Sequence, residues 1–298
     1  MTRQPDAGAI VSLDRVMISF PVYQGGSRSL KKRVLFYGSA GRIGTDASDQ
    51  IVIEALREVS FSLAAGDRVA LIGANGAGKT TLLRAIAGIY EPVQGEVVTR
   101  GRISPMFDIN LGIDTDLSGF DNIHLRALLL GLTPAEIERR VPEIVEFAEL
   151  GDYLEMPVRT YSAGMILRLS FAVATCFEPE ILLMDEWILA GDAHFMARAE
   201  TRVRNFVERA SVVVLASHNL DLCRRWCTTG IWLDRGAIRE MGPIDEVVRR
   251  YQAFVSTGAA HCSLSYEAQP VAPVKYKLSY QVRRHRAVDL DLARDTPE

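Results

Sequence analysis

The sequence has 298 residues, of which 48% are hydrophobic, and a formal net charge of -3. This length allows one large domain or two modest ones, and the hydrophobic content is ample for a real core. The charge balance gives no global reason to expect a nucleic-acid partner. Because no apolar run is long enough to span a bilayer and no secretion signal is visible, we expect the chain to stay on the side of the membrane where it is made.

The four cysteines are scattered, and Cys223 and Cys227 stand four residues apart on a predicted helix. That spacing can hold a metal ion, but no histidine or cysteine partner stands at zinc-finger spacing. The pattern therefore favours reduced, structural thiols.

Two predicted strands open the chain, at residues 9–20 and 52–63. Phe20 ends the first strand, and its ring either packs against the protein or stacks on a base. Between the strands, residues 24–50 combine a basic stretch (Lys31-Lys32-Arg33) with a short apolar patch and Gly/Ser-rich flanks. Two interpretations stay open for this insertion: a long surface loop, or an amphipathic piece that faces a membrane or a partner.

The next feature is a glycine-rich loop between an apolar strand at 68–72 and a helix at 82–87 that Gly88 closes. It fits the pattern G-x-x-x-x-G-K-[ST], followed by a second threonine. Glycines let successive amides converge on an anion, the helix start adds positive potential, and a lysine adds a full charge. A glycine-rich turn without a ligand is the competing interpretation, but strand, loop and helix together favour a phosphate site. The residues expected to bind the nucleotide are Gly73, Asn75, Gly76, Ala77, Gly78, Lys79, Thr80 and Thr81.

Helices are predicted from about 119 to 177, with a capping box at Thr133 and a break or kink at Pro142. Buried strands then return at 181–186 and 211–216. We therefore predict an α/β fold of P-loop type, with a mostly parallel core sheet, an antiparallel β subdomain and an inserted helical subdomain at about 104–178.

The strand at 181–186 ends in two carboxylates. Asp185 is placed to reach a Mg²⁺ ion held by Thr80, and Glu186 to polarise the attacking water as a general base. A solvated turn is the alternative for an Asp-Glu pair alone.

The run Tyr161-Ser162-Ala163-Gly164-Met165 resembles the signature sequence of ABC ATPases. The resemblance implies a homodimer around two ATP molecules, in which Ser162 and Gly164 contact the ATP held by the opposite copy. It further implies that His218 contacts the γ-phosphate and that Ala190-Gly191-Asp192 is the D-loop. Lys79, Glu186 and His218 are then the catalytic set, with Phe20 as a candidate adenine contact.

Details of the signature and of the insertion look like one branch of that family, the ATP-binding subunits of polysaccharide, O-antigen, capsule and teichoic acid exporters. The branch implies a separate integral membrane permease and a peripheral position at the cytoplasmic side of the inner membrane. The family glutamine that links Mg²⁺ to the permease is missing. Asp108 stands near its expected place, either as a metal ligand beside Thr80 and Asp185 or as a cap of the following turn.

The resemblance covers residues 9 to about 250. We expect residues 1–254 to form one ATP-binding domain and residues 255–298 to form a short, partly disordered extension. Two rival functions remain. A soluble ABC ATPase of the DNA-repair or ribosome class would usually carry zinc modules, coiled coils or two cassettes, and a P-loop kinase would lack the signature.

Overall fold

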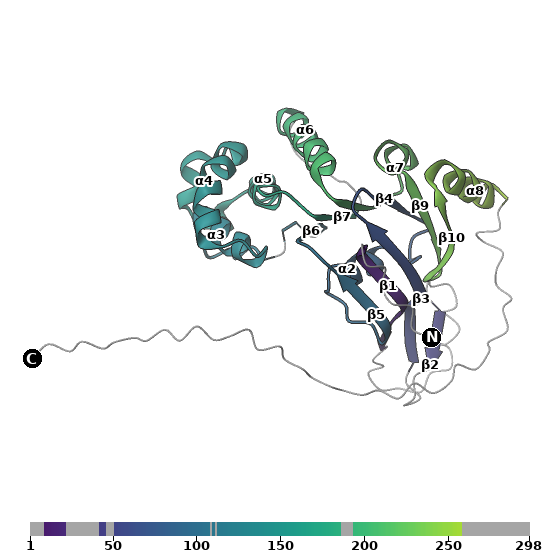
Figure 1. Cartoon of the computed structure of the whole chain (residues 1–298). Coiled ribbons are helices and arrows are strands. Elements are labelled where there is room, and N and C mark those ends of the chain that lie inside the picture. Colours follow the sequence, from purple (N-terminus) through teal and green to yellow (C-terminus); the bar gives the residue numbers. More distant parts are fainter. Residues whose placement is uncertain are drawn as a thin grey trace, which may run out of the picture.

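The computed structural model describes residues 9–21, 42–45, 51–107, 109–110, 112–185 and 193–257. Its strands form two sheets (Figure 1), a small one in the order β2-β3-β1-β5 and a large one in the order β10-β9-β4-β8-β7-β6. The strands are β1 Ala9–Pro21, β2 Arg42–Thr45, β3 Ile51–Ala64, β4 Arg68–Ile72, β5 Gln94–Thr99, β6 Ile103–Met106, β7 Ile181–Asp185, β8 Val212–Ala216, β9 Thr229–Asp234 and β10 Ala237–Pro243.

The small sheet is antiparallel throughout. In the large sheet every neighbouring pair is parallel except β10 with β9. The predicted combination of a parallel core, an antiparallel subdomain and inserted helices is therefore confirmed.

The helices cover the large sheet in separate groups (Figure 1): α2 lies toward the small sheet, α6, α7 and α8 lie on the other face, and α3, α4 and α5 gather beyond β6 and β7. Short 3-10 turns at Gly151–Glu155 and Val158–Thr160 lead into α5. The helices are α2 Lys79–Ile86, α3 Gly119–Leu129, α4 Pro134–Ala148, α5 Ala163–Ala174, α6 Ala193–Arg209, α7 Leu220–Trp226 and α8 Ile244–Ser256.

Side chains that alternate along the central strands form two hydrophobic cores, one on each face of the large sheet. On β7, Leu183 points into the cluster that holds α2 and the small sheet. Its neighbours Leu182 and Met184 point into the cluster formed with the other helices. Because successive side chains of a strand face opposite sides, a sheet covered on both faces needs apolar residues at nearly every position. This explains the continuous run Ile181-Leu182-Leu183-Met184.

Three local predictions need correction or refinement. Of the break or kink predicted at Pro142, the break is wrong, since α4 continues through this residue to Ala148. Pro142 is exposed, whereas Ile144 and Phe147 on the same helix are buried, so packing of the apolar face sustains the helix. Residues 104–106 fall inside the range of about 104–178 predicted for the helical insertion, but they belong to β6 of the large sheet. Within the predicted 24–50 insertion, Arg42–Thr45 forms β2 on the edge of the small sheet, and the rest of it lies outside the described residues.

Cys223 and Cys227 are buried free thiols, and burial raises their pKa values to about 11 and about 12. In the part of the chain that the structure describes, no three His, Cys, Asp or Glu side chains gather as a metal cluster. None of the helices described there is long and apolar enough to cross a bilayer.

Candidate nucleotide site

Three chain segments with predicted functional residues leave the large sheet at one edge. The strand register places Leu71 opposite Ala216, and Ala216 opposite Asp185. All three strands are parallel, so their carboxyl ends lie side by side. The glycine-rich loop, the Asp185 carboxylate and the Ser217-His218 pair are therefore brought to the same edge, where ligands of open α/β sheets bind.

The glycine-rich loop depends on close backbone approach at two positions. A Cβ at Gly73 would lie 2.3 Å from the carbonyl oxygen of Leu233. Gly78 has a φ of 106°, and a Cβ there would lie 2.8 Å from the carbonyl oxygen of Ala55. Any larger residue would push the loop away from the strands behind it. Glycine is therefore required at both positions by the packing of the loop.

Lys79 begins α2 and folds back into the loop. Its Nζ donates to the carbonyl oxygens of Gly73 and Ala74, at 2.8 and 3.1 Å, and only 7% of the residue is exposed. No side chain caps the start of α2, because Gly78 occupies the N-cap position. An uncapped helix start beside an ammonium group is chemically suited to a phosphate.

The other loop residues surround this start. Asn75, Gly76 and Thr80 are exposed, and Thr81 is half-buried. Ala77 is buried, and its carbonyl oxygen accepts a hydrogen bond of 2.9 Å from the amide of Gly236. The hydroxyl of Thr80 and the carboxylate of Asp185 are hard oxygen donors of the kind that Mg²⁺ prefers, so the residues present fit that ion.

His218 is exposed at the same edge and is followed by a firmly anchored helix. The side chain of Asn219 accepts from the amides of Asp221 and Leu222, at 3.1 and 3.0 Å, which caps α7. Ser217 is buried, and its hydroxyl accepts from the amide of Asn219 at 3.1 Å. These bonds hold the backbone on the carboxyl side of His218.

The predicted signature lies on a different helix, set apart from α2 (Figure 1). Ser162 is the N-cap of α5, and its hydroxyl accepts from the amide of Met165 at 3.3 Å. Ser162, Ala163 and Gly164 are all exposed, so the start of α5 faces solvent in the single chain. The structure therefore does not bring the signature into the phosphate loop of its own chain.

Two tyrosines beside the candidate residues have contacts that the sequence did not predict. The buried Tyr161 donates its hydroxyl to the carbonyl oxygen of Tyr153 at 2.5 Å, which fixes the residue before Ser162. Tyr90 meets Phe20 edge to face at 5.1 Å and accepts a hydrogen bond of 3.2 Å from Arg84. Its place directly after the phosphate-loop helix was a usable signal, but the surrounding Pro and Gly residues indicated only a turn.

Several predicted residues lie outside the described residues: Asp108, Glu186 and the proposed D-loop at 190–192. Their roles stay predictions. The binding roles of the residues above are predictions as well.

Comparison with known proteins identifies the family. A family model described as "ABC transporter" matches residues 56–189. The O-antigen export system ATP-binding protein RfbE of Yersinia enterocolitica is 45% identical over 225 residues, which cover 76% of this chain and 94% of that protein. The chain belongs to the ABC transporter family. As a member of this family it binds ATP and is an ATPase, and both predictions are confirmed.

Other relatives point to the same branch of the ABC transporter family. The teichoic acids export ATP-binding protein TagH of Listeria monocytogenes is 36% identical, over 82% of this chain and 70% of that protein. The O-antigen export protein RfbB of Myxococcus xanthus is 38% identical, over 86% of this chain and 58% of that protein. The predicted resemblance to the polysaccharide-exporter branch is therefore confirmed.

Solved structures agree on the ABC fold. The ATP-binding subunit of an ABC transporter matches with a TM-score of 0.59 at 22% identity, over 86% of this chain and 99% of that one. A dimeric ATP-binding cassette in a post-hydrolysis state, bound to ADP and Pi, matches with a TM-score of 0.56 at 21% identity, over 78% and 98% of the two chains.

Proposed function

We propose that this ABC ATPase powers the export of a polysaccharide or lipid-linked glycan through a separate membrane permease. The observation that carries the proposal is the 45% identity to an O-antigen export subunit, over 94% of that protein. A match that spans nearly the whole relative includes the regions outside the common ATPase core, where branches of the family differ.

The residues at the carboxyl edge have distinct tasks in this proposal. The amides of the glycine-rich loop and the ammonium of Lys79 bind the β- and γ-phosphates. Thr80 and Asp185 hold Mg²⁺, which neutralises phosphate charge. Glu186 follows Asp185 directly in the sequence, polarises the attacking water and takes its proton. His218 contacts the γ-phosphate from the end of β8.

The exposed start of α5 supports a homodimer. Ser162 presents a hydroxyl, and the helix start presents amides, to whatever lies in front of them. In the proposed dimer, Ser162 and Gly164 of one copy close on the ATP held by the loop of the other. The dimeric cassettes among the solved structures of the same fold support a dimer.

The contact with the permease is assigned to parts outside the ATPase core. The basic and apolar insertion at 24–50 is proposed to face the permease or lipid head groups, attached to the core through the edge strand β2. Asp108 is proposed to report the state of Mg²⁺ to the permease. We assign residues 1–254 to the ATP-binding domain and 255–298 to a short extension, and we place the protein at the cytoplasmic face of the inner membrane.

The proposal is tested in cells that lack this gene. Wild-type protein should restore the surface glycan, while Lys79→Ala protein at equal abundance should not. The protein should also co-purify with a membrane permease and without nucleic acid or ribosomes. Unchanged surface glycans in the deletion strain, together with co-purification of ribosomes, would instead support a soluble ABC ATPase.

A further inference from the structure

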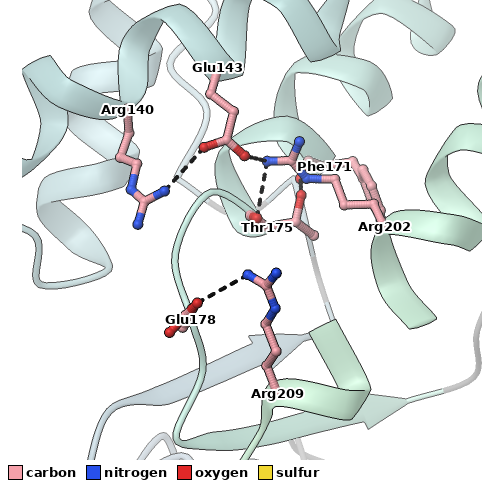
Figure 2. Close-up of polar contacts among 7 residues, drawn as sticks. All are labelled: Arg140, Glu143, Phe171, Thr175, Glu178, Arg202 and Arg209. Atoms are coloured by element: carbon pink, nitrogen blue, oxygen red, sulfur yellow. Dashed lines mark hydrogen bonds and ion pairs between the residues drawn. The ribbon is translucent and has the colours of Figure 1, made fainter. Parts of the chain in front are cut away.

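A cavity of about 700 Å³ lies between the helical insertion and the ATPase core. Helix α4 and the connection from α5 to β7 form one side, and the length of α6 forms the other (Figure 2). That connection enters β7 at its amino end, whereas the nucleotide site lies at the carboxyl edge. The charged residues that line the cavity are Arg140, Glu143, Glu178, Arg198, Arg202 and Arg209.

Arg202 is the fixed centre of this charged wall. Only 16% of its side chain is exposed, and its Nη2 donates to Glu143 at 2.7 Å and to the carbonyl oxygen of Thr175 at 3.1 Å. Its guanidinium lies 4.4 Å from the centre of the Phe147 ring. Burial lowers the pKa of Arg202, and the charge of Glu143 opposes that effect. Both hydrogen bonds use one nitrogen, so the planar fork keeps donor capacity for a further anion.

Two more arginines border the opening and are held less firmly. Arg140 pairs with Glu143 at 3.2 Å, and Arg209 pairs with Glu178 at 3.1 Å. The side chains of Arg140 and Arg209 are 45% and 65% exposed, respectively. Exposed ion pairs contribute little to stability, so either arginine can turn toward an incoming anion at small cost.

The cavity carries more positive than negative charge. Four arginines and two glutamates line it, a surplus of two positive charges. Glu149 does not line the cavity, but it forms an ion pair with Arg198. Because Glu149 also lies 3.6 Å from Arg168, its negative charge is divided between the two arginines. Guanidinium groups bind phosphate through paired hydrogen bonds, which makes a phosphate the favoured ligand group.

Three aromatic residues also line the cavity, namely Phe147, Phe177 and Phe206. An arginine wall beside phenyl rings suits a ligand that joins a charged group to a flat apolar one. The cavity volume is in the range of small-molecule sites. We propose that this cavity binds a small phosphate ester carrying an aromatic or similarly flat group, and thereby joins the helical insertion to the core.

The consequence is control of ATP turnover from a second site. A ligand that contacts α4 and α6 together favours one placement of the helical insertion over others. Because α5 of that insertion carries Ser162, bound ligand changes how the signature meets the opposite nucleotide. The inference does not depend on which molecule the transporter exports.

The binding test uses phenyl phosphate as the probe and isothermal titration calorimetry as the measurement. The full-length protein is first saturated with Mg²⁺ and a non-hydrolysable ATP analogue, so that the phosphate loop is filled. We expect saturable binding, weakened at least about fivefold in Arg202→Gln and Arg209→Gln, because each loses a charge-assisted hydrogen bond. Glu143→Gln should bind more tightly, because a competing carboxylate is removed. Arg204→Gln is the matched control: Arg204 lies on the same helix, is 60% exposed and does not line the cavity.

The same proteins are then assayed for ATPase activity with and without the probe. Phenyl phosphate should change the rate of wild-type and Arg204→Gln protein but not that of Arg209→Gln. Arg209 is the most exposed of the paired arginines, so this variant is expected to fold, and its melting temperature checks that. Absence of saturable binding, equal binding by all variants, or equal loss in Arg204→Gln would each overturn the proposal. So would weaker binding by Glu143→Gln, since that would show that the pairs serve only to hold the helices together.

Discussion

The Nζ of Lys79 lies 2.8 Å from the carbonyl oxygen of Gly73, so the ammonium closes the loop from which it emerges. The carbonyl oxygens of Gly73 and Ala74 accept from the ammonium at the mouth of the loop. In the proposed complex with ATP the same ammonium donates to phosphate oxygens. The arrangement positions the lysine for its ligand in advance.

We therefore expect Lys79→Ala to lose nucleotide affinity. Loss of a charge-assisted hydrogen bond to phosphate costs about 1.5–3 kcal/mol, which corresponds to about 10- to 150-fold in the dissociation constant. Titration with a fluorescent ATP analogue measures it. Arg100→Gln removes an exposed charge from the connection between β5 and β6 and serves as the control. Equal affinities of Lys79→Ala and wild-type protein would show that the ammonium does not bind phosphate.

Glu186→Gln should separate binding from turnover. The amide keeps the size of the side chain but cannot accept the proton of the attacking water. ATP affinity should stay near that of wild-type protein, while the rate of hydrolysis falls at least about a hundredfold. Gel filtration with ATP should then show a trapped dimer. Hydrolysis by Glu186→Gln at the wild-type rate would remove Glu186 from the mechanism.

The exposed signature leads to a mixing experiment. Ser162→Arg protein and Lys79→Ala protein should each be inactive, the first because the arginine blocks the contact with the opposite ATP. A mixed dimer contains one intact site, formed by the loop of one chain and the signature of the other. Partial recovery of ATPase activity is therefore expected in the mixture. The control experiments must show that heterodimers form and that one intact site suffices for activity. If activity still does not recover, the site is not shared between chains.

Phe20 offers a way to separate contacts with the base from contacts with phosphate. The ring of Phe20 meets that of Tyr90 edge to face. Phe20 therefore has two candidate roles, which are packing against Tyr90 and stacking on the adenine base. If Phe20 stacks on adenine, Phe20→Ala should weaken ATP binding about 5- to 100-fold, as removal of a stacked aromatic ring does elsewhere. Binding of inorganic tripolyphosphate should not change. Equal weakening for both ligands would show that the ring only supports the loop through packing.

The sequence predicted the parts of this protein that local patterns determine. The strand at 181–185 and the loop from Gly73 to Thr80 were readable because burial on both faces and phosphate binding each demand particular residues. The continuation of α4 through Pro142 was not, since it depends on the packing of Phe147 against neighbouring helices. The arginine cavity was also invisible, because Glu143 and Arg202 lie 59 residues apart and meet only in the fold.

The contacts of His124 predict that the stability of the helical insertion depends on pH. Its Nδ1 lies 2.8 Å from the carbonyl oxygen of Phe120, and its Nε2 lies 3.0 Å from a carboxylate oxygen of Glu138 on the next helix. The protonated ring donates to both oxygens. The contact with Phe120 first, and then that with Glu138, raises the pKa of His124 above its ordinary value of 6.5. A raised pKa in the folded state means that the native protein binds the proton more tightly than the unfolded chain.

The stabilisation is therefore complete below pH 6.5 and is lost as the pH rises through the pKa of the folded state. Urea unfolding of wild-type and His124→Gln protein should show the largest difference in unfolding free energy near about pH 6 and a smaller one near about pH 8. Glu138→Gln should reduce that pH dependence, because it removes one of the two acceptors while the bond to Phe120 remains. A difference between wild-type and His124→Gln protein that stays constant from acid to alkaline pH would mean that the ring contributes by packing and not by its charge.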